Sequence, residues 1–246
     1  MINIVIPMAG QGSRFVKSGY KKPKPFIDVN GKPMIVRVLE NLAYPNARYI
    51  LIARKEHIEK EAVLVAKIEK EFNAIFIPIN KLTEGTACTA LYARKYINND
   101  EPLLIANSDQ IVDINIADFI DDCVDRNIDG SILTFVDEYK DPKWSFARID
   151  ENSLVIEVKE KVVISKFATV GVYLYSRGKD FVDATVDMII ENDRVGNEFY
   201  TCPTYNYAIK EGLKIGIYNI EFEQMHGIGT PDDLNLYLKH VASLPI

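Results

Sequence analysis

Apolar runs of strand length alternate with amphipathic segments along the first hundred residues, and this alternation constrains the fold more than any other feature. Runs rich in β-branched residues favour buried strands, which we expect at 3–7, 48–53, 74–78 and 102–106. The segments between them have helical periodicity, with helices expected at 33–43, 56–72 and 85–96. A repeated strand–helix–strand order predicts an α/β fold with a mostly parallel sheet and right-handed crossovers.

The pattern changes in the second half of the chain, where strand-like segments follow one another closely. Strands are expected at 131–136, 146–150, 154–160, 167–175 and 214–220, with a hairpin turn at 150–153. Helices are expected at 116–126, 179–192, 198–211 and 231–241. Because no repeat or flexible linker interrupts the chain, we predict one domain over 1–246. Its second half, 114–246, would continue the sheet of 1–113 and add a small β-rich substrate lobe.

Composition excludes some partners. The chain has 29 Lys and Arg against 35 Asp and Glu, a net charge of -6, so neither nucleic acid nor a membrane surface is expected as a partner. The three cysteines lack paired metal spacing, which indicates buried thiols in a reducing compartment. The chain begins directly with a strand, and no apolar run approaches the roughly 20 residues of a membrane span. A cytoplasmic location is therefore expected.

The loop after the first strand has the residues of an anion site. Gly10 and Gly12 let backbone N–H groups approach a phosphate closely, and Arg14 and Lys24 add positive charge. The dinucleotide fingerprint does not fit, because Phe15 takes the place of its third glycine and the next strong helix start lies far downstream, near residue 33. The Walker loop does not fit either, because no Gly-Lys pair ends the loop. An ordinary tight turn is the alternative interpretation.

Three polar segments follow strands, at 10–14, 81–87 and 107–113. Because ligands of open α/β sheets bind outside the carboxyl ends of the strands, we expect these segments to gather at one edge. Asp109 is placed there to bind a hard divalent cation, with a helix cap or Asx turn as the alternative.

Gly85 would let the backbone approach a flat ring, and Thr86 would bond at its edge, although Thr83 or Thr86 would serve equally as a helix cap.

The second half offers a candidate site for another phosphorylated substrate. Lys161 would hold a phosphate and Glu160 would contact other polar groups, although charged strand ends are commonly just solvated edges. Asn197 and Glu198 precede an aromatic segment, where both residue types also serve as helix caps.

Together these motifs resemble the sugar-phosphate nucleotidyltransferases, also called NDP-sugar pyrophosphorylases, and particularly their short capsule-associated bacterial branch. The resemblance spans nearly the whole chain and rests on the order of the motifs more than on any one of them. In chain order the motifs are G-Q-G-S-R-F, P-K-P-F, G-K-P-M-I, E-G-T-A, S-D, E-K, T-V-G-V-Y, N-E-F-Y and G-I-G-T-P-D-D-L.

The resemblance implies a Rossmann-like, mostly parallel mixed sheet of the glycosyltransferase-A type. It implies that a nucleoside monophosphate moves from an NTP to a sugar phosphate or a similar small phosphate ester, with Mg²⁺ as cofactor and pyrophosphate released. The half 1–113 would bind the NTP and the half 114–246 the acceptor. The motif E-G-T-A resembles that of members that use CTP or UTP, so a pyrimidine nucleotide is expected.

The resemblance also assigns roles to individual residues. Arg14 and Lys24 would neutralise charge on the leaving pyrophosphate, and Asp109 would hold Mg²⁺. The residues implied in nucleotide binding are Met8, Ala9, Gly10, Gly12, Ser13, Glu84, Gly85, Thr86, Asn107 and Ser108. The residues implied in acceptor binding are Glu160, Lys161, Gly171, Asn197 and Glu198. An acceptor phosphate is already ionised near neutrality, so attack on the α-phosphorus needs no general base.

One position departs from the family pattern. Many members carry an Asp, the second Mg²⁺ ligand, where this chain has Gly227. Either Glu221 or Glu223 takes that role, or one carboxylate and the NTP suffice. His226 beside it would contact substrate, or is merely packed or solvated.

Two other functions use the same features. A glycosyltransferase that consumes an NDP-sugar normally has a D-x-D metal site, whereas this chain has Ser108-Asp109-Gln110. A regulatory module would bind nucleotide without turnover. The sequence leaves open whether identical chains assemble into an oligomer.

Overall fold

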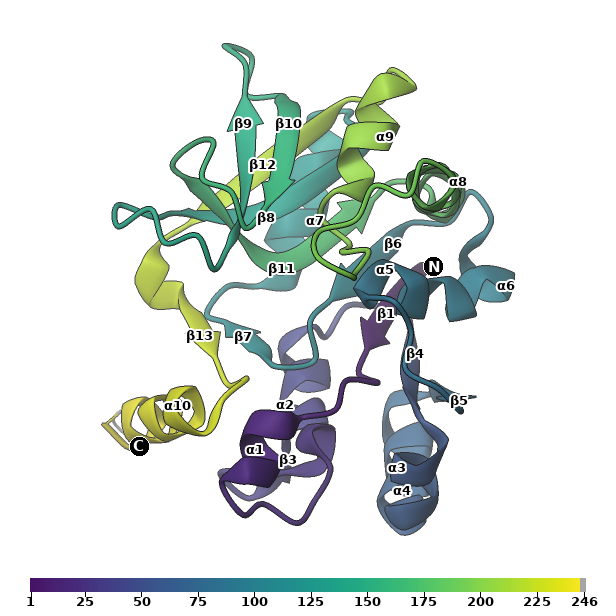
Figure 1. Cartoon of the computed structure of the whole chain (residues 1–246), viewed down its shortest axis with the longest axis vertical. Helices are drawn as coiled ribbons and strands as arrows, with labels where there is room; N and C mark the ends of the chain where they lie inside the picture. The colour runs from purple at the N-terminus through teal and green to yellow at the C-terminus, as the bar shows by residue number, and fades with distance from the viewer. Residues whose placement is uncertain (244–246) are drawn as a thin grey trace.

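Four parallel strands lie side by side in a nine-stranded mixed sheet in the computed structural model, which describes residues 1–243 (Figure 1). Their spatial order is β6 (Leu103–Ala106), β1 (Ile2–Pro7), β4 (Ala47–Arg54) and β5 (Ala74–Ile79). The register between β1 and β4 runs without a break from Ile2 opposite Ala47 to Pro7 opposite Ile52. All four predicted strands and their parallel direction are confirmed.

Strands β1 and β6 and most of β4 are buried on both faces, which explains why they read as continuous apolar runs, whereas β5 lies at the edge of the sheet and is partly exposed. In β1 the side chains of Ile4 and Ile6 join the hydrophobic cluster on one face, and Val5 joins the cluster on the other. All three are completely buried. A parallel sheet needs helices over both faces, because its crossover connections place them there.

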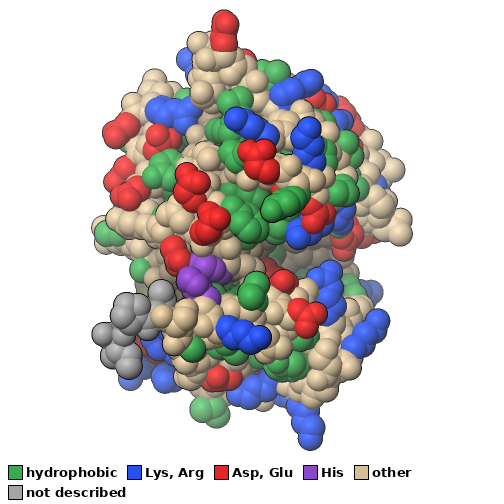
Figure 2. Space-filling model, turned by 90° about the vertical axis from the view of Figure 1, so that its left-hand side faces the viewer, with side chains coloured by type: hydrophobic (Ala, Val, Ile, Leu, Met, Phe, Trp, Pro, Cys, Tyr) green, Lys and Arg blue, Asp and Glu red, His purple; other side chains and the backbone are tan. Residues whose placement is uncertain are grey.

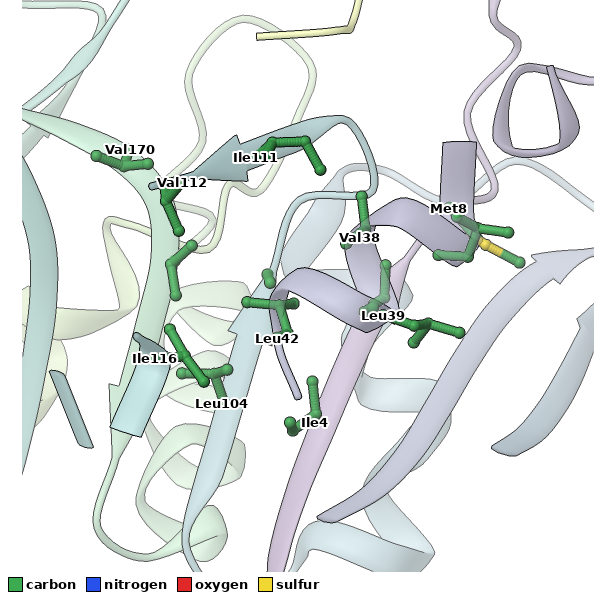
Figure 3. Packing of buried hydrophobic residues seen from close by; sticks show 14 of the residues in the cluster. Ile4, Met8, Val38, Leu39, Leu42, Leu104, Ile111, Val112, Ile116 and Val170 are labelled. Atoms are coloured by element: carbon green, nitrogen blue, oxygen red, sulfur yellow. The ribbon is translucent and has the colours of Figure 1, made fainter. Parts of the chain in front are cut away.

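Helices supply that cover. One face is covered by α2 (Met34–Asn41), α4 (Ala62–Phe72), α7 (Ile116–Asp125) and α10 (Pro231–Ser243). The other face is covered by α5 (Thr86–Ala90), α6 (Arg94–Ile97), α8 (Gly178–Ile190) and α9 (Thr204–Lys210). Figure 3 shows Leu39 of α2 and the adjoining Leu42 packed against Ile4 and Leu104 of the central strands.

The second half of the chain extends the sheet in the antiparallel sense. The added strands are β8 (Gly130–Val136), β9 (Ser145–Ile149), β10 (Val155–Glu160), β11 (Phe167–Tyr175) and β12 (Ile215–Ile220). Strand β11 lies antiparallel to β6, β8 and β9, and β12 lies parallel to β8. The predicted hairpin turn at 150–153 joins β9 to β10. These strands form the upper part of Figure 1, as expected for a β-rich lobe.

Several predicted helices have different bounds. The helix expected at 56–72 is two helices, α3 (Lys55–Lys60) and α4, because Glu61 leaves helical geometry at ψ 32°. The helix expected at 85–96 is divided into α5, a 3₁₀ turn η2 (Leu91–Ala93) and α6.

The helix expected at 198–211 begins only at Thr204, after Pro203. A residue before proline is disfavoured in the helical region. Residues 198–202 instead form an irregular segment, so Asn197 and Glu198 are not caps of this helix.

Some elements escaped prediction because they are very short. The loop after β1 leads directly into α1 (Ser13–Lys17), so a helix begins at residue 13 as well as near residue 33. A 3₁₀ turn, η1 (Lys24–Phe26), precedes the paired strands β2 (Asp28–Val29) and β3 (Lys32–Pro33). A turn η3 (Phe222–Gln224) leads into β13 (Met225–Gly227), which pairs with β7 (Gln110–Val112) as a separate ribbon. Within 1–243, none of the helices is both long and apolar enough to cross a bilayer.

Candidate active site

The three polar segments predicted to meet lie at one edge of the sheet. Strands β1 and β6 are parallel neighbours, so 10–14 and 107–109 leave the sheet on the same side. Helix α5, which 81–87 enters, packs against β1 (Figure 1). The three segments therefore gather at the carboxyl ends of the parallel strands, as expected for an open α/β sheet.

The loop after β1 is an open turn with a tightly packed base. Gly12 has a φ of 60°, a left-handed conformation that favours glycine, and a Cβ there would lie 2.9 Å from Cβ of Lys24. Phe15 is buried and anchors α1, while Ser13 and Arg14 are exposed. The loop thus presents polar groups outward from a fixed base, as a phosphate loop requires.

Lys24 and Asp109 form an ion pair across this edge. Their side chains keep 20% and 27% of their exposure, so both are accessible to a ligand. Gly229 packs against Oδ2 of Asp109 so closely that a Cβ there would overlap it. The backbone N–H of Ile228 donates to the Asp109 carbonyl at 2.9 Å. The carboxylate is therefore positioned by segments from both halves of the chain, and it does not cap a helix.

Asp109 fits a Mg²⁺ ion that takes its other ligands from phosphate and water, which is the usual way proteins bind this ion. The two candidates for a second carboxylate lie elsewhere. Glu221 caps η3 by accepting from the Gln224 backbone, and Glu223 lies in the same turn. The ribbon pairs Gly227 with Gln110, which places η3 beyond the opposite end of β7 from Asp109. Gly227 itself faces open space. The structure thus brings the Asp109 carboxylate to Lys24, whereas Glu221 and Glu223 lie apart from both.

Asn107 lies against Gly171, so the predicted nucleotide and acceptor residues meet. The Asn107 N–H donates to the Gly171 carbonyl at 2.9 Å. Gly171 has a φ of 93° within a register shift of β11, and a Cβ there would overlap the Asn107 amide. Glycine is therefore required at 171 for both conformation and space. Ser108, next to Asn107, is partly exposed.

Gly85 and Thr86 have partners within the protein. Gly85 has a φ of 119°, and a Cβ there would overlap the backbone of Phe199. The Phe199 N–H donates to the Glu84 carbonyl at 2.7 Å, and the N–H of Thr201 donates to Oγ1 of Thr86 at 3.2 Å. These contacts join the start of α5 to the segment before α9, and neither Thr83 nor Thr86 caps the helix. The contact of Gly85 and Thr86 with a base stays a prediction.

Other residues of the predicted nucleotide site lie near the contact between the start of α5 and the segment before α9. Glu84 forms an ion pair with Arg194 at 2.9 Å, and the Arg194 guanidinium lies 4.3 Å from the Phe199 ring centroid. Met8 and Ala9 are buried, and the Met8 N–H donates to a β4 carbonyl. Gly10 is exposed with open space around it, so backbone access to the loop is unobstructed.

Lys161 and Tyr200 form the clearest polar pair of the predicted acceptor site. The Lys161 ammonium donates to the Tyr200 hydroxyl at 2.5 Å and lies 4.4 Å from the ring centroid. That hydrogen bond raises the pKa of Lys161, which keeps the side chain positively charged. Lys161 also has a φ of 56°, a strained conformation that is typical of functional sites in a residue with a side chain.

Glu160 is buried beside this pair. Burial raises the pKa of its carboxyl, and a hydrogen bond from Oγ of Ser145 opposes that effect. Glu198 lies close enough to Tyr200 to affect its pKa, which burial raises. Asn197 is exposed in the preceding turn. The structure thus brings Glu160, Lys161 and Glu198 together and leaves Asn197 at the rim.

Sequence reasoning missed three residues of this edge. Gly229 lies within the G-I-G-T-P motif, which was a usable signal, but no role followed from it. Tyr200 stands in N-E-F-Y, within the helix expected at 198–211, and no role followed from it. Ser145 carries no sequence signal, because only the pairing of β9 with β10 places it opposite Glu160.

The fold and the site define a class of protein. A parallel sheet with a glycine loop, a lysine and a carboxylate at adjoining strand ends is suited to bind and transform phosphate esters. The chain belongs to the nucleotidyl transferase family, whose family model matches residues 4–212.

Known proteins with detectable similarity agree. Mannose-1-phosphate guanylyltransferase catalytic subunit beta of Drosophila melanogaster is 27% identical, covering 70% of this chain and 47% of that protein. Bifunctional protein GlmU of Methanococcus vannielii is 29% identical, covering 98% and 56%. The nucleoside-diphosphate-sugar pyrophosphorylase of Vibrio cholerae RC9 superposes with a TM-score of 0.81 at 26% identity, covering 96% and 99%. The chain spans about half the length of the curated relatives it matches first.

Proposed function

We propose that this chain transfers a nucleoside monophosphate from an NTP to a sugar phosphate or similar small phosphate ester. An acceptor phosphate oxygen forms a bond to the α-phosphorus, and the bond from that phosphorus to the bridging oxygen breaks, so that its electron pair leaves with pyrophosphate. The observation that carries the proposal is the Lys24–Asp109 pair at the adjoining ends of β1 and β6. Family membership and relatives named for guanylyl transfer to mannose 1-phosphate support it.

Positioning and charge stabilisation would supply the catalysis. Gly10, Gly12 and Ser13 would hold the phosphates, and Lys24 with Arg14 would face the charge that develops on pyrophosphate. Asp109 would hold Mg²⁺, which when bound neutralises phosphate charge and orients the triphosphate. No residue is needed as a covalent nucleophile, because the acceptor phosphate is itself the nucleophile.

The acceptor would lie over β10 and β11, on the other side of Asn107. Lys161 offers a positive charge for the acceptor phosphate, and its hydrogen bond to the Tyr200 hydroxyl fixes the position of the ammonium. Glu160 and Glu198 offer polar contacts for hydroxyl or amino groups. In this proposal the pyrophosphate faces Lys24 and the acceptor phosphate faces Lys161.

The finer parts of the proposal are the nucleotide and the setting. We propose CTP or UTP as donor, because E-G-T-A resembles the motif of pyrimidine-using members. Synthesis of an NDP-sugar-like precursor of capsular polysaccharide in the cytoplasm is the corresponding role. The resemblance of the ordered motif set to the short capsule-associated branch is what supports that role.

The test is pyrophosphate release from each of the four NTPs with a panel of sugar 1-phosphates and alditol phosphates, with Mg²⁺ or with EDTA. We expect release with a pyrimidine nucleotide, only when an acceptor and Mg²⁺ are both present. The NTP that raises the thermal midpoint most identifies the donor independently. Tight NTP binding without product from any acceptor would favour the regulatory module. Hydrolysis of NDP-sugars in place of pyrophosphate release would favour the glycosyltransferase.

A further inference from the structure

A cluster of two histidines and one aspartate lies where the β7–β13 ribbon meets α10, at the opposite end of β7 from Asp109. Asp113 directly follows β7, His226 is the middle residue of β13, and His240 lies in the last turn of α10. In β13, Gly227 has open space around it, whereas the preceding residue, His226, forms a hydrogen bond with Asp113. Asp113 follows the end of β7, and Asp109 precedes its start. The proposed nucleotidyl transfer leaves all three side chains without a role.

The three side chains converge from three elements. Nε2 of His226 lies 2.7 Å from Oδ2 of Asp113, and the rings of His226 and His240 stack with centroids 4.6 Å apart at 29°. One ligand atom from each residue lies within 4.8 Å of the other two. Two of the three histidines in the chain contribute to this cluster. In Figure 2, histidine side chains in purple lie beside acidic side chains at the edge of the hollow that crosses this face.

We propose that Asp113, His226 and His240 form a binding site for a divalent transition-metal ion of the Zn²⁺ type. Two imidazoles and one carboxylate suit Zn²⁺, Co²⁺ or Ni²⁺, whereas Mg²⁺ prefers oxygen ligands. Three protein ligands also match the donor number of zinc sites that keep a fourth position for water. The proposal does not depend on nucleotidyl transfer.

The ligand geometry requires only a small closure. Bonds of about 2.0–2.2 Å in a tetrahedral set place ligand atoms about 3.4 Å apart. Since the ligand atoms lie within 4.8 Å of one another, no pair must approach by more than about 1.4 Å, and the His226–Asp113 pair at 2.7 Å must separate by about 0.7 Å. His240 lies half-buried near the end of an outer helix, where rotation of its side chain can supply that movement. The carbonyl end of a helix also attracts a cation.

An ion there would connect α10 to the ribbon that positions the active-site carboxylate. Strand β7 begins one residue after Asp109, and β13 leads to Gly229, which packs against that carboxylate. A metal bound by His226 and His240 would hold β13 and α10 together. We therefore expect the ion to raise the thermal midpoint of the protein, because it binds the folded arrangement alone.

The test is titration of the chelator-treated full chain carrying Asp109→Asn, which removes the proposed Mg²⁺ carboxylate from the measurement. Zn²⁺ binding is followed by calorimetry and Co²⁺ binding by visible absorption. We expect a single equivalent, the ligand-field bands of a four-coordinate cobalt site without thiolate charge transfer, and a higher thermal midpoint. Adding His240→Ala or Asp113→Asn should weaken binding by at least about tenfold, whereas His57→Gln should not change it.

Two results would overturn the site. The first is an affinity for Zn²⁺ that stays the same when His240→Ala or Asp113→Asn is added to the Asp109→Asn protein. That result would mean that other groups bind the ion. The other is no binding of either ion up to about a millimolar concentration, the weak end of protein metal sites. The two variants lie on different elements, so unfolding of one, judged from its circular dichroism, leaves the other as the test.

Discussion

The ammonium of Lys24 donates to Oδ2 of Asp109 across 85 residues of sequence, and Gly229 lies against the same carboxylate oxygen. Three segments thus determine where this carboxylate points: η1, the end of β6 and the loop after β13. The lysine is held in turn by Gly12, whose missing Cβ leaves room for it. The glycine loop after β1 and the proposed metal ligand are therefore packed as one unit.

The first prediction concerns this pair. Asp109→Asn and Lys24→Met should each reduce the kcat of pyrophosphate release at least about a hundredfold, because each removes charge stabilisation of the transition state. Steady-state assays at saturating NTP measure the effect. Lys22→Met, a nearby exposed lysine, serves as the control and should retain nearly full activity. A loss of less than tenfold in both site variants would contradict these roles.

The second prediction concerns the contact between Gly85 and Phe199. Gly85→Ala would force a Cβ into the Phe199 backbone at an unfavourable φ of 119°. Gly212→Ala is the matched control, because Gly212 also has a positive φ, of 84°, but has open space around it. The first variant should lose about 2 kcal/mol more of the free energy of unfolding than the second, which is the cost of the overlap. Denaturant melts that show equal losses would mean that this contact relaxes freely.

The strands and their direction could be predicted because the cause is local. Strands β1 and β6 and most of β4 are apolar runs buried on both faces, and this pattern is visible in residues such as Ile4, Val5 and Ile6 of β1. The predicted helix bounds were wrong where a single residue interrupts the helical pattern, as Pro203 does before α9. The ribbon of β7 and β13 was not predicted, because three-residue strands carry too little periodicity to detect.

The site was predictable to the extent that strand ends determine it. Asp109 and the lysine met because β1 and β6 are neighbours. The partners of Thr86 and Glu160 were not predictable, because the contacts with Thr201 and Ser145 depend on tertiary packing across 115 and 15 residues. Glu221 and Glu223 were placed by proximity in sequence to Gly227, whereas the register of the ribbon takes them away from Asp109.

The third prediction separates the two substrates. Lys161→Met should raise the KM for the phosphorylated acceptor at least about tenfold and leave the KM for NTP unchanged, because a charged hydrogen bond is worth about 1.5–3 kcal/mol. Tyr200→Phe keeps the ring beneath the ammonium and should have a smaller effect.

Lys159→Met is the control for the third prediction, since Lys159 lies on β10 two residues before Lys161, is likewise exposed, and pairs with Glu157. A parallel rise in the KM values for both substrates would remove the acceptor role of Lys161.

The fourth prediction concerns the buried carboxyl of Glu160. Because burial raises its pKa in the folded state, the native protein retains this proton at pH values where the unfolded chain has lost it. Stability then falls as the pH rises from about the ordinary pKa of 4.5 through the raised value, since deprotonation favours the unfolded state. Above the raised pKa the destabilisation is complete and constant.

Glu160→Gln keeps a neutral side chain that can still bond to Ser145 Oγ. The stability of this variant relative to the wild type should therefore increase with pH above about 4.5 and then level off, as measured by urea unfolding at a series of pH values. Glu151→Gln, in the exposed turn between β9 and β10, is the control and should run parallel to the wild type. Parallel curves for Glu160→Gln as well would show that folding does not raise the pKa of Glu160, and would contradict this prediction.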